Sequence, residues 1–236
     1  MRNLLVTFLC VITLTTTQSL TAQTVDFNQK RSITLQGVID ERTLGKANEL
    51  AAFAEVSDEP IDILISSPGG VISHGLYFIQ SMKAAQAKGI KVRCYVSTLA
   101  ESMAYTIFTQ CSERYALPYS TLLFHAPRIS GNFLITPPVA ARLAQGLSDI
   151  EQTLLEIVLP VMGVTEEVGL QWFSEAYIDE RLFVAADLLA ESPVKWFTVV
   201  GKIDNCPDQS VDPYSEPKAK ENKKRRQRAD YVYIKK

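Results

Sequence analysis

The sequence predicts an α/β domain in which helices flank a mainly parallel sheet. Three strand-like segments, at 61–65, 90–96 and 121–124, alternate with helix-like segments, and the first is a mostly apolar run bounded by turn residues. Strand–helix–strand repetition at this spacing implies right-handed crossovers, which place the helices on the faces of the sheet. The 236 residues are 47% apolar and 21% charged, which suits one globular domain with appendages and excludes a fibrous or wholly disordered chain.

Turn and capping residues define the individual elements. Gly37 and Gly89 end a strand and a helix, and Asp40 is suited to cap a helix that runs through Ala54. The elements are expected in the order strand 33–37, helix 40–54, buried strand 61–65, helix 71–88, strand 90–96, helix 101–110 and strand 121–124.

The longest predicted helix covers 136–160. Thr136 can cap it, Pro137 suits its first turn, and Pro160 marks its end. Its apolar residues recur at spacings of four and three, and they are Leu143, Leu147, Ile150, Leu154 and Ile157. Such a stripe packs either on its own domain or against a copy of itself, and the sequence leaves both open.

Residues 1–22 have the three-part layout of a secretory signal peptide. They contain one charge, Arg2, followed by an apolar run at 4–14 and by small and polar residues that end at Ala22. The run is too short to cross a bilayer as a helix. We therefore expect export to the periplasm or the exterior, with cleavage after Ala22. The alternative is a buried N-terminal helix.

The C-terminal segment 207–236 carries nine Lys or Arg against five Asp or Glu, and almost no aliphatic residues before Val232. It cannot bury enough surface to fold alone, so we predict a disordered basic tail after a folded domain at 23–206. The tail is either solvated or docks on an acidic surface, such as a membrane or the body of the protein. A nucleic-acid partner is not expected, because the whole chain carries a net charge of -2 and an export signal.

The cysteines and histidines are too few and too scattered for a structural zinc site, and no metal or cofactor is expected. Cys94, Cys111 and Cys206 remain once the signal peptide is removed, and an odd number allows at most one intrachain disulfide. Cys94 and Cys111 are expected to pack internally. The alternative is three buried free thiols.

A glycine-rich turn, Ser66-Ser67-Pro68-Gly69-Gly70, follows a buried strand and opens a helix. Its glycines let the backbone turn sharply and leave amides that favour negative charge, either a phosphate or the oxyanion of an acyl-transfer intermediate. The spacing matches neither GxGxxG nor Walker A, which disfavours nucleotide binding. A plain turn is the alternative.

Ser102 and His125 form a candidate nucleophile and base. Ser102 begins a predicted helix, where the amide of Met103 could support an oxyanion, although a capping serine would look the same. His125 ends a buried strand, at the edge where α/β sheets build their sites. The other histidine, His74, lies one turn into a helix and is expected to be exposed, so His125 is the better partner for a serine.

Three segments in this order resemble the proteolytic subunit of the Clp protease family. They are Ile-Ser-Ser-Pro-Gly-Gly-Val-Ile at 65–72, Ala-Glu-Ser-Met-Ala at 100–104 and Leu-Phe-His-Ala-Pro at 123–127, within a likeness that extends over 31–200. The resemblance implies the Clp/crotonase fold, a repeated β-β-α superhelix with a projecting handle helix, here 136–160. In the family this handle interlocks rings of subunits, which implies a homo-oligomer.

The resemblance also implies a serine endopeptidase. Ser102 would be the nucleophile and His125 the base, with oxyanion amides from Gly69, Gly70 and Met103. The third triad member is either Asp179 or Glu180, since an ungapped match at 183–185 favours the glutamate and the usual residue type favours the aspartate.

The sequence departs from the family at Thr98, where glycine is usual, and in its export signal, since the usual ATP-driven partner is cytoplasmic. We therefore expect ATP-independent hydrolysis of small or unfolded peptides. Three other readings remain: a crotonase-like thioester enzyme, a Ser–Lys enzyme like signal-peptide peptidase, and a silent ring-forming protein.

Overall fold

The computed structural model describes residues 23–132, 134–171, 183–185, 187–188 and 194–207. The predicted signal peptide, the basic tail beyond Pro207 and both candidate acids, Asp179 and Glu180, lie outside these residues. None of the described helices is long and apolar enough to cross a membrane.

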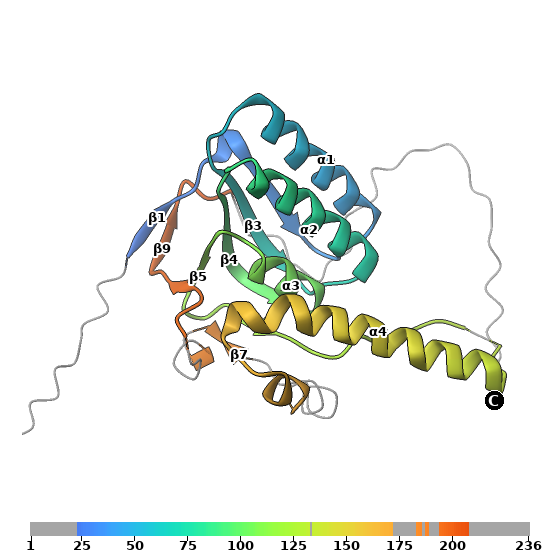
Figure 1. Ribbon diagram of the computed structural model, residues 1–236. Coiled ribbons are helices and arrows are strands. Elements are labelled where there is room, and N and C mark those ends of the chain that lie inside the picture. The colour runs from blue at the N-terminus through green and yellow to red at the C-terminus, as the bar shows by residue number, and fades with distance from the viewer. Residues whose placement is uncertain (1–22, 133, 172–182, 186, 189–193, 208–236) are drawn as a thin grey trace, which may run out of the picture.

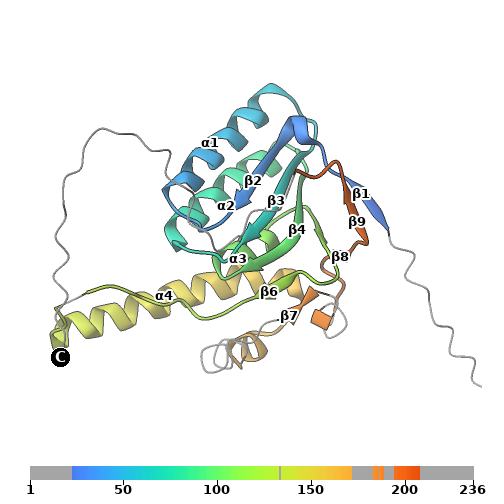
Figure 2. The same ribbon diagram turned by 180° about the vertical axis from the view of Figure 1, so that it is seen from behind.

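Among the described residues, a seven-stranded sheet forms the centre of the domain (Figures 1 and 2). Five strands are parallel neighbours, in the order β2 (Ser32–Gln36), β3 (Ile61–Ser67), β4 (Val92–Glu101), β5 (Glu113–Ala116) and β8 (Thr198–Val199). The C-terminal end of β4 also pairs with β6 (Thr121–Leu123), and β7 (Phe183–Val184) lies antiparallel beside β6. The predicted α/β fold with a mainly parallel sheet is confirmed.

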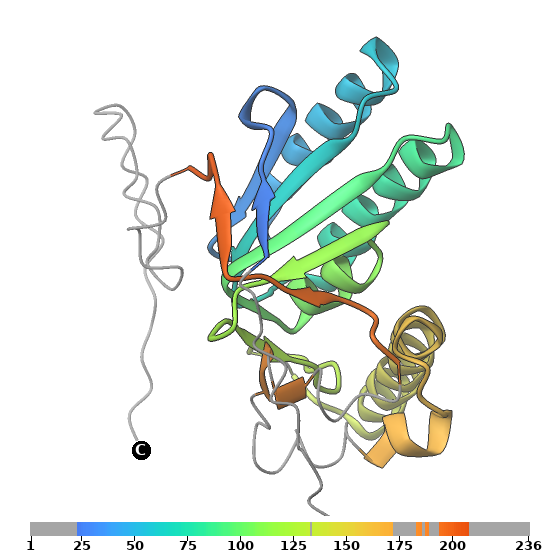
Figure 3. The same cartoon turned by 90° about the vertical axis from the view of Figure 1, so that its left-hand side faces the viewer.

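Helices cover one face of this sheet and a small β-ribbon covers the other (Figure 3). The helices are α1 (Glu41–Val56), α2 (Ile72–Ala87) and α3 (Met103–Thr109), and the ribbon pairs β1 (Thr24–Asp26) with β9 (Lys202–Asp204). A short 3-10 helix (Gln29–Arg31) leads from β1 into β2. Asp40 caps α1 as predicted, since its carboxylate accepts from the backbone N–H of Arg42 at 2.9 Å.

The strand β3 is buried along its whole length, as the unbroken apolar run predicts. Ile63 and Ile65 pack toward the helices, whereas Leu64 packs on the opposite side with Tyr95. Asp62 is the one charged residue of the strand, and Arg93 of β4 holds its carboxylate through two hydrogen bonds of 2.6 and 2.8 Å. A buried charge is tolerated here because it is paired.

The strands that the sequence did not predict are β1, β5, β8 and β9, and β4 continues beyond the predicted 90–96. Most are two to four residues long, and the four residues of β5 include the charged pair Glu113 and Arg114. Arg114 is accommodated because its guanidinium donates to the carbonyls of Trp196 and Thr109, at 2.6 and 3.2 Å. A distant partner such as Trp196 leaves no periodic signal in the sequence.

The longest helix, α4 (Pro137–Met162), projects well beyond the sheet, and the chain that follows β6 runs beside it (Figure 2). Pro160 was expected to end the helix, but it lies inside the last turn and Gly163 ends the helix in a left-handed conformation, with φ 66°. The carbonyl that Pro160 leaves without an intrahelical donor belongs to Glu156, which is exposed and therefore open to solvent. This explains why the proline is tolerated there.

The apolar stripe of α4 is divided between two environments. Leu154 is buried in the domain core at 5% exposure, and Ile157 packs against that core. Leu143 and Leu147 are only half-buried on the projecting part. Of the two kinds of packing that the sequence left open, Leu154 packs on its own domain, because the C-terminal half of the helix packs on α3.

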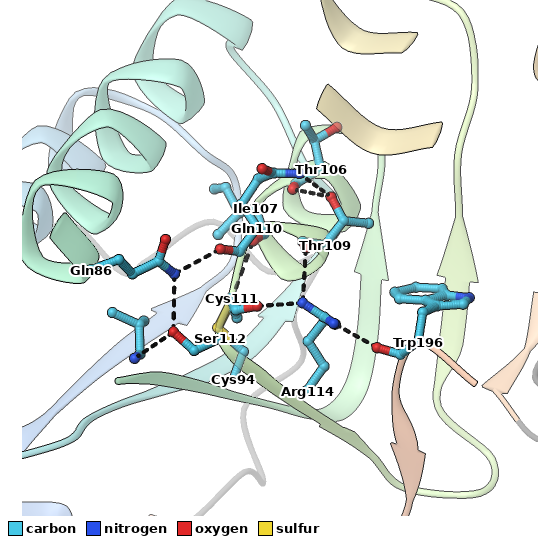
Figure 4. Close-up of a disulfide and its surroundings, with 11 residues drawn as sticks. Gln86, Cys94, Thr106, Ile107, Thr109, Gln110, Cys111, Ser112, Arg114 and Trp196 are labelled. Atoms are coloured by element: carbon cyan, nitrogen blue, oxygen red, sulfur yellow. Dashed lines mark hydrogen bonds between the residues drawn. A yellow bond between two sulfur atoms is a disulfide. The ribbon is translucent and has the colours of Figure 1, made fainter. Parts of the chain in front are cut away.

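A disulfide joins Cys94 of β4 to Cys111, just after α3 (Figure 4). Both cysteines are buried, as predicted, and Cys206 is the free thiol. The bond closes a loop with a sequence separation of 17 residues, and this loop contains Ser102. The disulfide therefore ties together the strand and the helix that meet at Ser102.

Replacing both cysteines, Cys94→Ala with Cys111→Ala, is expected to lower the free energy of unfolding by about 3 kcal/mol, because the unfolded chain regains the freedom of that loop. Denaturant unfolding measures the loss, and Cys206→Ala, which breaks no bond, is the matched control. Equal stability of the double variant and the control, or a mass spectrum with three free thiols, would contradict the assignment.

Candidate active site

Ser102 and His125 follow the ends of two neighbouring parallel strands. The pairing of β4 with β6 sets Glu101 opposite Leu123, and the backbone N–H of Ser102 donates to the carbonyl of Leu123 at 2.7 Å. His125 follows two residues later. The carboxyl ends of adjacent strands in such a sheet are where sites are built, so the topology brings the predicted pair to one edge.

The backbone of Ser102 is in an unusual conformation, with φ 53° and ψ -124°. A positive φ is uncommon for a residue with a side chain, and it persists only where the surroundings enforce it. Sharp strand-to-helix turns of this kind hold a side chain out from the sheet. Ser102 stands at the N-cap of α3 but makes no side-chain capping hydrogen bond, so the capping alternative is not what the structure shows.

The glycine-rich turn after β3 lies directly against Ser102. Gly69 has φ 86°, and a Cβ at this position would lie 2.5 Å from both the Glu101 carbonyl oxygen and the Ser102 Cβ. The turn is held from the other side by Ile39, whose N–H donates to Gly69 O and whose carbonyl accepts from Val71 N, each at 2.8 Å. Only glycine fits at this close approach.

The backbone N–H groups around Ser102 differ in whether they already donate a hydrogen bond within the protein. The N–H of Gly69 donates to Ser67 Oγ at 3.1 Å, so it is already occupied. Gly70 N–H and Met103 N–H have no acceptor among the described residues, and the first amides of a helix have no intrahelical partner. Two of the three predicted oxyanion donors, Gly70 and Met103, therefore remain candidates.

The imidazole of His125 is half-buried, and its Nδ1 lies 2.7 Å from the carbonyl oxygen of Ala126. A carbonyl oxygen can only accept a hydrogen bond, so this contact requires the proton to be on Nδ1. In the neutral imidazole the lone pair is then on Nε2. This is the tautomer that a general base toward a serine hydroxyl needs.

A cavity of about 890 Å³ opens at this edge of the sheet, and both Ser102 and His125 line it. Its walls come from the glycine turn, the start of α2, the first turn of α3, the segment after His125, and Ile150 and Leu154 of α4. Most of these side chains are apolar. The cavity thus offers an apolar surface beside a serine, a histidine and two available amides.

The sequence matches the Clp protease family over residues 16–167, which is more than half of the chain. The chain belongs to the Clp protease family. The resemblance expected from the three motifs is thereby confirmed, and the parallel sheet with its flanking helices is consistent with the Clp/crotonase-like fold. Membership points to a peptidase, a hydrolase of peptide bonds, and family members typically form oligomeric rings.

In this Clp protease, close packing behind the cavity fixes α3. A side chain at Gly75 of α2 would collide with that of Met103, so the glycine lets the two helices approach. The hydroxyl of Tyr105 donates to Met162 Sδ at 3.1 Å, and Gln110 Nε2 donates to Ile157 O at 2.6 Å. These bonds anchor α4 to the helix that begins beside Ser102.

Of the remaining residues considered in the sequence analysis, the structure describes His74 but not the two candidate acids. Asp179 and Glu180 lie outside the described residues. His74 was expected to be exposed but is half-buried, and its Nδ1 is buried without a partner among the described residues. The described residues contain no group of three or more His, Cys, Asp or Glu that could hold a metal ion.

Two residues near the site were not anticipated. Glu101, directly before Ser102, is buried at 9% exposure, and Arg128 is the one permanently charged side chain among the described residues that line the cavity. The sequence could have indicated both residues. Glu101 is a carboxylate directly after the apolar pair Leu99-Ala100, and Arg128 is a cation three residues after His125.

Gly69→Ala tests the close approach of the turn to Ser102. We expect a loss of stability of about 1–3 kcal/mol, because a Cβ at positive φ would also displace Glu101 and Ser102, together with a large fall in peptide turnover. Gly45→Ala is the control, since Gly45 lies in α1 with nothing within 4 Å and the change should stabilise the helix slightly. Thermal unfolding and turnover measure both variants. Wild-type behaviour of Gly69→Ala would contradict the described contact.

Proposed function

We propose that this protein is an exported serine endopeptidase that hydrolyses small or unfolded peptides without ATP. One observation carries the proposal: Ser102 has a strained backbone at a strand-to-helix turn and lines the same cavity as His125. Strain of this kind is retained where a reactive group must be held in place. A serine that only capped a helix would need neither the positive φ nor the histidine.

The proposed reaction is acyl transfer through Ser102. His125 Nε2 takes the proton from the serine hydroxyl as Oγ attacks the scissile carbonyl, and it returns that proton to the leaving amine. Water then repeats the sequence on the acyl-enzyme and releases the second product. The bond from Nδ1 to Ala126 O supports this assignment, because it leaves the lone pair on Nε2.

The negative charge that develops on the carbonyl oxygen needs donors that are already in place. Gly70 N–H and Met103 N–H are the proposed donors, since Gly69 N–H is bonded to Ser67 Oγ. Fixed donors of this kind lower the barrier because they need no reorganisation during the reaction.

The proposed third member of the triad is Asp179 or Glu180. Support comes from the neighbouring strands: β7 starts at Phe183 and pairs with β6, the strand that leads to His125. This antiparallel pairing sets Phe183 opposite Leu122, three residues before His125, which supports the choice of an acid that shortly precedes Phe183 in the sequence. An acid there would stabilise the imidazolium that forms during proton transfer.

Export and ATP independence rest on the sequence of residues 1–22 and on the disulfide. A buried Cys94–Cys111 bond suits an oxidising compartment outside the cytoplasm. ATP-driven unfolding is not expected in such a compartment, so the substrates would be peptides that are already short or unfolded.

Ser102→Ala and His125→Ala are each expected to abolish hydrolysis of a fluorogenic peptide while leaving thermal unfolding unchanged. Loss of either member of a serine triad lowers turnover by up to about a millionfold. Turnover by His125→Ala equal to wild type would contradict the triad and favour a lysine base instead.

The same assay separates the two candidate acids. Asn or Gln at the true acid, in Asp179→Asn or Glu180→Gln, should cost about 10⁴ in rate because the imidazolium that forms during proton transfer loses its negative partner, and the other variant should stay within about tenfold of wild type.

We further propose that the subunits assemble into rings through the projecting part of α4. The segment that leads into this helix exposes Leu134 at 89% and Ile135 at 63%, and Leu143 and Leu147 stay half-buried further along. Apolar surface left in water costs about 25 cal/mol per Å², so pairing of such segments between subunits is favourable. The rings typical of the family supply a symmetry for this contact.

Leu134→Glu with Ile135→Glu is expected to dissociate the assembly without unfolding the subunit, because both side chains are exposed. Leu154→Glu is the comparison: this leucine is buried, so the change should unfold the domain instead. Light scattering and circular dichroism distinguish the two effects. A folded wild-type monomer at tens of micromolar would contradict assembly.

A further inference from the structure

Glu101 is the last residue of β4 and lies directly before Ser102. It is 9% exposed, and the residues before it, Leu99 and Ala100, are buried and apolar. A buried carboxylate costs free energy unless it is hydrogen-bonded, and an apolar residue would continue the strand equally well. Packing alone therefore does not account for a glutamate at this position.

The carboxylate is bonded to the strand that leads to His125. Thr121, the first residue of β6, donates its hydroxyl to Glu101 Oε1 across 3.3 Å. In the register of the two strands, Leu99 lies opposite Thr121 and Glu101 opposite Leu123, so Glu101 and Thr121 are diagonal neighbours on one face. The side-chain bond adds to the backbone bond from Ser102 N–H to Leu123 O.

Both partners of this bond also touch the other parts of the site. The carbonyl of Glu101 lies against Gly69, within 2.5 Å of where a side chain would begin. Thr121 pairs on its other side with Val184 of β7. The side-chain bond thus links β4, whose end contacts the glycine turn and leads to Ser102, to β6, the strand that leads to His125.

We propose that Glu101 is a positioning residue that acts through Thr121 to fix Ser102 relative to His125. The inference rests on the proposed serine-peptidase function, since the distance between nucleophile and base matters only if that pair reacts. The bond joins the last residue of β4 to the first residue of β6, the strand that leads to His125, and it adds to the backbone bond from Ser102 N–H to Leu123 O in holding the two strands in register. Without the side-chain bond the register and spacing of the two strands are held less firmly, and proton transfer slows.

Four variants separate this role from simple stabilisation. Glu101→Ala and Thr121→Val each remove the bond, and we expect each to lower kcat by about ten- to a hundredfold, because small misplacements of reacting groups are costly. KM should stay within about threefold of wild type, since the apolar walls of the cavity are unchanged. Glu101→Gln and Thr121→Ser keep an acceptor and a hydroxyl, and both should retain kcat within about threefold.

The double variant Glu101→Ala/Thr121→Val should lose less activity than the product of the two single losses, because both changes remove the same bond. Tyr95→Phe is the control: its hydroxyl donates to Asp26 O at 3.2 Å on the opposite side of the sheet, away from the site. This control should lower the melting temperature while leaving kcat unchanged.

The outcomes are distinguishable. If wild type is active and Ser102→Ala is not, but Glu101→Ala and Thr121→Val keep wild-type kcat, the positioning role is overturned and the proposed function stands. Additive losses in the double variant would likewise overturn it. A wild-type protein without any peptidase activity would overturn the proposed function and this inference together.

Discussion

The close approach between the glycine turn after β3 and the end of β4 is the constraint on which the site depends. Gly69 leaves no room for a Cβ against Glu101 and Ser102, and Ser102 adopts a positive φ beside it. Such a conformation costs about 1–3 kcal/mol and persists only if the surroundings determine it. Two bonds restrain the backbone around Ser102 in this way. One is the backbone hydrogen bond from Ser102 N–H to Leu123 O, and the other is the disulfide between β4 and the end of α3. The strained serine is thus held by contacts on three sides.

The projecting helix is coupled to this arrangement by packing. Leu154 belongs to both the domain core and the wall of the cavity. Tyr105 of α3 and Gln110, the residue that caps α3, are bonded to the C-terminal half of α4. Burial raises the pKa of Tyr105 far above its usual value, so its hydroxyl stays neutral and acts as a structural contact. A helix that carries the proposed subunit contacts therefore also forms part of the site.

The elements that were predicted correctly are those that local sequence patterns specify. The buried strand β3, the helices α1 and α2, and the order of the three motifs follow from apolar runs, a capping aspartate and glycine turns. The short strands β5 and β8 did not follow, because their stability comes from distant partners such as Trp196 for Arg114. The prediction that Pro160 ends the long helix was wrong. A proline is tolerated inside a helix when the carbonyl that loses its N–H donor, here that of Glu156, lies on an exposed residue.

The residues of the candidate site could be predicted from the sequence, but their conformations and hydrogen bonds could not. Ser102, His125 and the glycine turn could be named from their places at strand ends, whereas the positive φ of Ser102 and the occupied amide of Gly69 depend on contacts between separate segments. The pairing of Cys94 with Cys111 likewise needed the fold, since the sequence only limits the number of disulfides. Glu101 was overlooked because its role arises from pairing with Thr121 across two strands.

The most direct test of the central claim is covalent labelling of the purified mature protein with a fluorophosphonate, followed by peptide mapping. A serine hydroxyl reacts with such a probe when a neighbouring base activates it. We predict one adduct, on Ser102 Oγ. A folded protein that remains unlabelled, or an adduct on a different serine, would contradict the account.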